Sequence, residues 1–157
     1  MRLFLLLSIV PLLALAKVTT EESPFSASET GNTSTYRTYK DNQYISSVIA
    51  MIGQNNKNER NIFFIYDYYR GMDCTPGTSV EDVAKFNGQS IKVYYFCNYS
   101  EKNKTNVVTF TPSTESGLKF LIGLFNTNNY VAIEYLGWSS YISTSGFSKA
   151  WLNAEPL

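Results

Sequence analysis

The chain has 157 residues, of which 44% are hydrophobic and 15% aromatic, and it carries 13 basic and 13 acidic side chains. This length fits one domain, and a formal net charge of zero without marked clustering of lysine and arginine gives no electrostatic footprint for nucleic acid. The sequence contains no histidine, which excludes Ser–His–Asp and Cys–His relays, H-E-x-x-H zinc sites and an imidazole pH switch.

The amino-terminal segment, residues 1–16, predicts a signal peptide. Met1 and Arg2 precede two apolar runs, and Ala14-Leu15-Ala16 forms the small-x-small pattern that signal peptidase accepts. The apolar stretch is shorter than the about 20 residues that a membrane-spanning helix needs. We therefore expect cleavage after residue 16 and a secreted, extracellular and soluble protein that does not bind membranes.

Short strands dominate the rest of the chain. Residues 17–35 are polar and are expected to form a loose or weakly helical lead-in, followed by one domain over residues 36–157. Turn residues separate β-branched and aromatic runs. These runs predict strands at Tyr36–Lys40, Tyr44–Gly53, Asn61–Tyr69, Ser90–Tyr99, Asn106–Thr111, Leu118–Phe125, Tyr130–Leu136 and Phe147–Leu152, with a weak extra strand at Trp138–Ser143. A short helix is expected only around Val80–Phe86, so the fold is predicted to be an all-β antiparallel sandwich or barrel.

The two cysteines and three glycosylation sequons agree with export. Under oxidising conditions Cys74 and Cys97 are expected to form a disulfide. The sequons begin at Asn32, Asn98 and Asn103, and none has proline in the middle. A glycosylated asparagine must face solvent. If Asn98 does so, alternation places Lys92, Tyr94 and Phe96 outward and Ile91, Val93, Tyr95 and Cys97 inward.

The segment Asn61–Tyr69 is mostly apolar or aromatic on both faces, so the strand is expected to be covered on each side. Ile62, Phe64, Tyr66 and Tyr68 share one of these faces. Asp67 interrupts the other face. It either reaches solvent at the strand end, pairs with a cation such as Arg70, or forms an anionic hook for a cationic ligand.

Four parts of the chain follow one another in an order similar to that of a known family. They are Tyr36-Arg37-Thr38-Tyr39; Ser47-Val48-Ile49-Ala50 with the Asn-rich turn and Ile62–Tyr69; the closely spaced strands Val107–Phe110, Phe120–Gly123 and Tyr130–Glu134; and Ala150-Trp151-Leu152. This order resembles the lipocalins, in particular the tick salivary lipocalins that include histamine-binding proteins. The resemblance implies an antiparallel up-and-down barrel of about eight strands, shortened at its carboxyl end. Where that family holds amines with acidic residues, this chain reads Asn129-Tyr130 and Lys149-Ala150.

A barrel of about eight strands either fills itself or holds one small ligand, in a pocket that is mostly apolar with a few polar groups. The candidates for its wall are Tyr66, Tyr68, Val93, Tyr95, Phe110, Phe120, Ile133, Trp138 and Trp151, and the candidate anions are Asp67 and Glu134. Glu134 alternates with Val131, Ile133 and Tyr135, so it faces solvent if those residues face the cavity.

The favoured function is a secreted carrier that sequesters a host mediator, a biogenic amine or a lipid, and so modulates inflammation or haemostasis. The alternative is a β-scaffold that binds a host protein through tyrosine-rich loops, because the chain has 12 tyrosines. An enzyme is not expected, since no motif places two of Asp67, Glu115 and Glu134 at one site. Two cysteines without histidine also predict no metal site and no cofactor.

Overall fold

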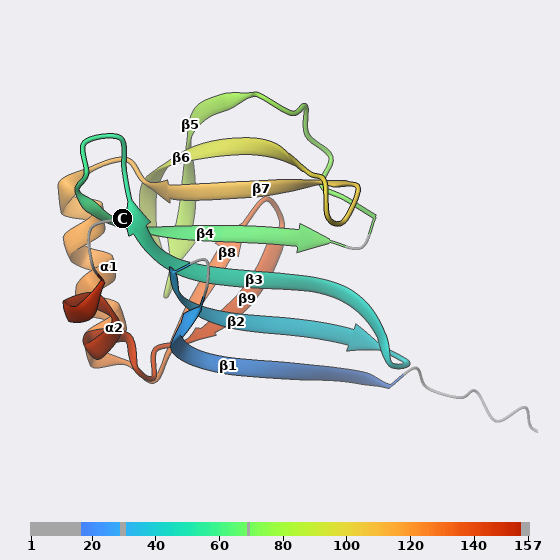
Figure 1. Cartoon of the computed structure of the whole chain (residues 1–157), viewed down its shortest axis with the longest axis horizontal. Helices are drawn as coiled ribbons and strands as arrows, with labels where there is room; N and C mark the ends of the chain where they lie inside the picture. The colour runs from blue at the N-terminus through green and yellow to red at the C-terminus, as the bar shows by residue number, and fades with distance from the viewer. Residues whose placement is uncertain (1–16, 29–30, 69, 155–157) are drawn as a thin grey trace, which may run out of the picture.

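The computed structural model describes residues 17–28, 31–68 and 70–154, so the expected signal peptide at residues 1–16 lies outside the described residues. This part of the chain forms nine strands and two helices (Figure 1). The strands are β1 (Val18–Ser28), β2 (Gly31–Lys40), β3 (Gln43–Gln54), β4 (Arg60–Tyr68), β5 (Ser79–Phe86), β6 (Gln89–Ser100), β7 (Thr105–Pro112), β8 (Tyr130–Tyr135) and β9 (Trp138–Ser143). The helices are α1 (Glu115–Thr127) and α2 (Phe147–Asn153).

All nine strands belong to one antiparallel sheet that curls into a nearly closed barrel, so the predicted all-β antiparallel barrel is confirmed (Figure 1). The strand order is β1-β2-β3-β4-β7-β6-β5-β8-β9. β4 and β7 share three ladder pairs, and β5 and β8 share two. Near the seam between the sheet edges, Ser34 Oγ donates to the Ser143 carbonyl at 3.0 Å and Phe25 N donates to the Ser145 carbonyl at 2.9 Å.

The loop between β4 and β5 crosses the open end of the barrel, opposite the helices. Met72 N donates to the Asn106 carbonyl of β7, and Gly77 N donates to the Cys97 carbonyl of β6. The expected disulfide between Cys74 and Cys97 is confirmed, and it fastens this loop to β6. In the sheet, β7 and β6 lie between β4 and β5, and the loop passes the ends of both.

Phenylalanine rings fill the half of the barrel interior that the two helices cover. Phe64 lies 5.0 Å from Phe86 and 5.2 Å from Phe110, measured between ring centroids. Phe125 of α1 and Phe147 of α2 pack at 4.9 Å, and α1 and α2 lie together at one end of the barrel (Figure 1). Because all five rings are buried and in contact with one another, they form the aromatic core of this half of the barrel.

The predicted alternation along β6 is confirmed. Ile91, Val93 and Cys97 are buried, Tyr95 is half-buried, and Asn98 is exposed on the opposite face. On β4 the inner residues Ile62, Phe64 and Tyr66 are buried, whereas Phe63 and Ile65 on the outer face are only half-buried. The expectation that this strand is covered on each side was therefore wrong for its outer face.

Two expected strands are helices. Residues 118–125 lie in α1, which Thr114 caps by accepting a 3.1 Å hydrogen bond from Gly117 N, and residues 147–152 lie in α2. In α1 the inward side chains of Leu121 and Phe125 recur at helical spacing, but half-buried apolar neighbours hide this period in the sequence. The Thr114 cap was the available signal, and it was missed.

Two segments that were not expected to be strands form strands. Val80–Phe86 was expected to be a short helix, but it lies within β5, where Ala84 and Phe86 face the core. Residues 18–28 were expected to be loose or weakly helical, but they form β1 and pair with β2 from Val18↔Lys40 onward. A polar strand at the sheet edge lacks the hydrophobic pattern that sequence reasoning uses.

Candidate functional site

A small cavity opens at the end of the barrel opposite the helices. Its walls come from β2, β3, β4, the β4–β5 loop and β9, and it leaves about 30 Å³ for the centres of water-sized molecules, room for about one or two waters. The lining residues are Tyr36, Thr38, Ser46, Val48, Tyr66, Asp67, Tyr68, Met72, Trp138, Ser139 and Ser140. Hydroxyl groups and aromatic rings dominate this lining, which contains one carboxylate and no lysine or arginine.

Two aromatic rings of the cavity lining contact each other. The centroids of Tyr68 on β4 and Trp138 on β9 lie 4.9 Å apart with the ring planes tilted by 55°. Both side chains are half-buried, and Met72 from the loop lines the same space. The two rings offer faces that attract a cationic or polarised group.

Tyr66 provides an unusual polar group in the wall of the cavity. Its side chain is 4% exposed, and its hydroxyl is buried without a hydrogen-bond partner in the described part of the chain. Burial raises the pKa of this phenol above the ordinary tyrosine value. An unpaired buried hydroxyl costs about 1–3 kcal/mol, so a group that bonds to it would gain from a site that is already desolvated.

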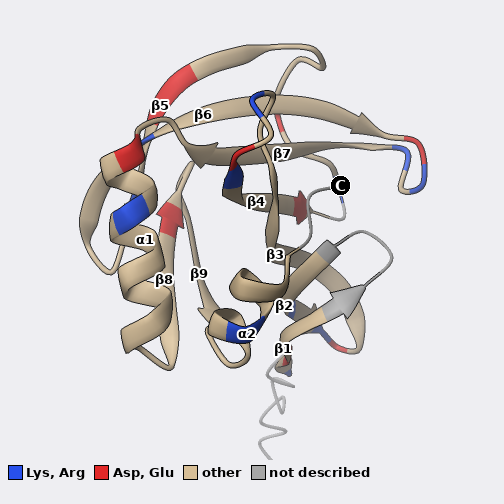
Figure 2. Ribbon diagram, turned by 60° about the vertical axis from the view of Figure 1, so that its left-hand side comes forward, with Lys and Arg blue, Asp and Glu red and all other residues tan. Residues whose placement is uncertain are grey.

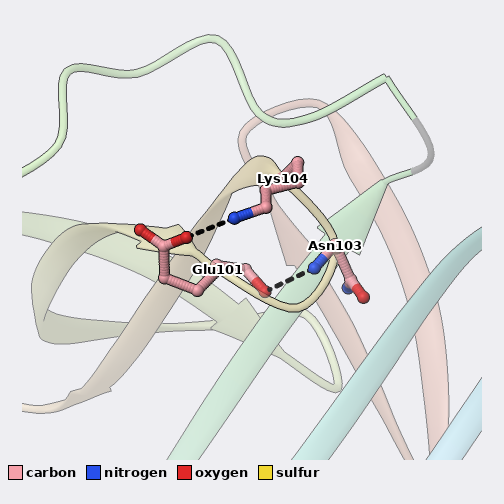
Figure 3. Close-up of polar contacts among 4 residues, drawn as sticks. Glu101, Asn103 and Lys104 are labelled. Carbon is pink, nitrogen blue, oxygen red and sulfur yellow. Dashed lines mark hydrogen bonds and ion pairs between the residues drawn. The ribbon is translucent and has the colours of Figure 1, made fainter.

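The Asp67 carboxylate belongs to the cavity lining and is held by neutral donors. Tyr44 Oη donates to Oδ2 at 3.1 Å and Asn103 Nδ2 donates to the same oxygen at 2.8 Å. Asn103 lies in the β6–β7 turn, where its backbone N–H donates to Ser100 Oγ at 3.3 Å (Figure 3). Burial, together with the charge of Asp67, raises the pKa of Tyr44 to about 12. Asp67 is thus a structural acceptor whose carboxylate is already engaged.

A second polar cluster, formed by Asp82, Tyr95 and Tyr135, lies on the inner face of β5, β6 and β8. Tyr135 Oη donates to Asp82 Oδ2 at 2.9 Å, and the Tyr95 ring lies 6.4 Å from the Tyr135 ring. Phe110 separates this cluster from the cavity, with ring centroids 4.4 Å from Tyr135 and 5.6 Å from Tyr66. Burial and then Asp82 raise the pKa of both tyrosines.

The structure brings together four of the sequence-predicted site residues, Tyr66, Asp67, Tyr68 and Trp138, and separates the others from them. Val93, Tyr95, Phe110 and Ile133 line the inner face elsewhere, and Phe120 lies on α1 at the helical end. Trp151 stacks on Phe147 of α2 at 5.7 Å. Glu134 is exposed and lies 3.8 Å from Lys85 Nζ, on the outer face as alternation predicted.

Sequence reasoning missed several lining residues: Tyr36, Thr38, Ser46, Met72, Ser139 and Ser140. Tyr36 and Thr38 alternate on β2, which is a signal for one shared face, but neither was weighed as a site residue. The hydroxyls of β9 lay in a strand that was expected to be weak. Asp82 was missed because its segment was expected to be helical.

No family model, curated protein or solved structure matches the chain. Among the described residues, no group of three or more potential cysteine or acidic ligands could hold a metal ion. Neither of the two described helices is long and apolar enough to cross a membrane. A functional proposal must therefore be based on the cavity at the open end of the barrel.

Proposed function

We propose that this chain is an exported small-ligand-binding protein and that the cavity at the open end of the barrel is its binding site. The buried and unpaired hydroxyl of Tyr66 is the observation that carries the proposal. If Tyr66 served only to fill the core, replacing it with phenylalanine would stabilise the fold, because the unpaired hydroxyl is costly to bury. In a binding site the same hydroxyl can form a hydrogen bond with the ligand. The disulfide and the signal-peptide pattern support export into an oxidising compartment.

The cavity has room for about one or two waters, which fits the ammonium group of a small amine rather than an acyl chain. Buried phenylalanine rings occupy the helical half of the barrel, where an acyl chain would have to lie. The rings of Tyr68 and Trp138 suit a cationic group, and none of the described lining residues is basic. The resemblance to tick salivary lipocalins favours a secreted carrier of a host mediator that acts in inflammation or haemostasis. It does not itself favour an amine, because this chain has Asn129-Tyr130 and Lys149-Ala150 where that family holds amines with acidic residues.

Ligand titration with tryptophan fluorescence tests the proposal. In a Trp151→Phe background Trp138 is the single reporter, and histamine, other aromatic amines and a fatty acid are the probes. An amine is expected to change Trp138 emission, and Tyr66→Phe is expected to weaken its binding about 5- to 10-fold. The same substitution should leave the free energy of unfolding unchanged or raise it.

The matched control is Tyr135→Phe, because the Tyr135 hydroxyl bonds to Asp82 outside the cavity. This variant should bind the amine as the parent protein does. Absence of any amine response, or equal affinity of the Tyr66→Phe variant, would overturn the proposal.

Exposed tyrosines favour a second candidate, a scaffold that binds a host protein. Tyr94, Tyr99, Tyr130 and Tyr141 are between 41% and 55% exposed, and all four lie on strands rather than in loops. Capture of one specific plasma protein that survives saturation of the cavity with amine would favour this function. Loss of capture after Tyr130→Ser and Tyr141→Ser would locate the surface on β8 and β9.

A further inference from the structure

An apolar surface lies on the outside of the barrel. Its six residues, which we call the outer apolar face, are Ile49 and Met51 of β3, Phe63 and Ile65 of β4, and Tyr94 and Phe96 of β6. They form two rows across the sheet. Ile49 pairs with Ile65 and Met51 pairs with Phe63. Thr109 of β7 pairs with both Ile65 and Phe96, and Thr111, two residues farther along β7, pairs with Tyr94.

From β3 to β6 neither row contains a charge, and the next residue beyond Tyr94 is the exposed Glu81 of β5. No helix covers this face in the described part of the chain. β3 and β7 carry no lysine, arginine, aspartate or glutamate over their whole length (Figure 2). Both helices lie at the end of the barrel (Figure 1). Tyr94 is 41% exposed, and the other five members of the outer apolar face are half-buried. A contiguous apolar surface of this kind marks a place that something covers.

The Asn98 sequon stands at the border of this face. Asn98 is exposed on the outer face of β6, two residues after Phe96, and the two side chains therefore point to the same side. Its Nδ2 lies 3.5 Å from Thr109 Oγ1, and Thr109 is the residue directly opposite Phe96 in the ladder. Asn98 Nδ2, the atom that would bear a sugar, therefore lies next to the row that contains Phe96 and Ile65.

We propose that Asn98 carries an N-linked glycan whose first sugar lies on the outer apolar face. In the transfer, Nδ2 displaces a lipid-linked diphosphate from the anomeric carbon of the sugar, and the amide loses one proton to the medium. The nitrogen keeps its second hydrogen, so its contact with Thr109 Oγ1 persists. A pyranose is uncharged and presents C–H groups to an aromatic face, which matches a surface of rings and aliphatic side chains without charge. Its hydroxyls then meet the solvent in place of Phe96 and Ile65.

The inference rests on the proposed export and not on ligand binding, because none of the six residues of the outer apolar face lines the cavity. Asn103 offers the matched control. It also begins a sequon, but it lies in the β6–β7 turn, where its Nδ2 donates to Asp67 rather than pointing at the outer apolar face (Figure 3). A glycan there would not cover Phe96.

The experiment uses the full chain secreted from glycosylating cells, with Asn98→Gln and Asn103→Gln as variants. Peptide mass spectrometry is expected to find a glycan at Asn98. Asn98→Gln should raise the fluorescence of an anilinonaphthalene sulfonate dye about twofold or more by uncovering the outer apolar face, whereas Asn103→Gln should leave it unchanged. Adding Phe96→Ser to Asn98→Gln should reverse the increase. Trimming the parent protein to one sugar should preserve its low dye binding.

Secreted protein with an unmodified Asn98 overturns the inference, and so does a glycosylated Asn98 whose removal leaves dye binding unchanged. Either result leaves the proposed function untouched, since the amine titration is run on the same secreted protein. Retention of the chain in the cytosol overturns both the inference and the proposed export.

Discussion

The hydroxyl of Tyr135 donates a 2.9 Å hydrogen bond to Oδ2 of Asp82 and so joins β8 to β5. These two strands share two ladder pairs, Lys85↔Glu134 and Phe86↔Ile133, which is a short seam in a nine-stranded sheet. Tyr135 is 4% exposed and packs on Phe110. The side-chain bond therefore strengthens the barrel wall where the backbone contributes little.

Tyr135→Phe is expected to lower the free energy of unfolding by about 1.5–3 kcal/mol, because hydrogen bonds to charged groups contribute that much and Asp82 loses a donor. Urea unfolding followed by circular dichroism measures the change. Tyr66→Phe serves as the control, since its hydroxyl has no partner to lose within the described residues. Equal losses in the two variants would show that removing any tyrosine hydroxyl from the interior is harmful and that the bond is not special.

Stability is expected to fall steeply above pH 10. Burial raises the pKa of Tyr66, and burial together with Asp82 raises the pKa of Tyr135, in both cases above the value of 10.0 for the free side chain. Between the unfolded and folded pKa values the unfolded chain has lost protons that the folded chain keeps, so rising pH favours unfolding. Each group contributes a slope of about 1.4 kcal/mol per pH unit.

Urea unfolding at pH 9, 10 and 11 tests the alkaline prediction. The slope above pH 10 should be smaller in Tyr66→Phe and in Tyr135→Phe than in the parent protein, and smallest in the double variant. A parental slope in the double variant would contradict the assignment to these two phenols.

The sequence predicted β3, β4 and β6 correctly because each is a β-branched and aromatic run bounded by turn residues. The period-2 alternation is visible in the sequence of β6, whereas in β3 and β4 it appears only in the burial of the side chains. The prediction of secondary structure failed where tertiary contacts or strand pairing determine it. α1 is a nearly continuous apolar run in which strand and helix cannot be separated by periodicity. β1 is polar and exists because its backbone pairs with β2. For the cavity, sequence predicted Tyr66, Tyr68 and Trp138 but not Tyr36 or Ser140, since facing pairs across a barrel depend on its closure.

Two adjacent phenylalanines on β4 should respond very differently to truncation. Phe64 is fully buried against Phe86 and Phe110, so Phe64→Ala is expected to cost about 3–5 kcal/mol of unfolding free energy. Phe63 is half-buried on the outer apolar face, so Phe63→Ala should cost less than half as much, about 1–2 kcal/mol. Thermal and urea unfolding of both variants measure the contrast. Similar losses would mean that the outer face is packed as tightly as the core.

Removing the disulfide should loosen the open end before it unfolds the barrel. Cys74 and Cys97 are 23 residues apart, and closing a loop of that length stabilises the fold by about 3 kcal/mol. Met72 lines the cavity two residues before Cys74, so a Cys74→Ser, Cys97→Ser variant should also change Trp138 emission at low urea. The Trp151→Phe background isolates that signal. Unchanged emission with a lowered unfolding midpoint would show that the Met72 N–H bond to Asn106 holds the loop without the disulfide.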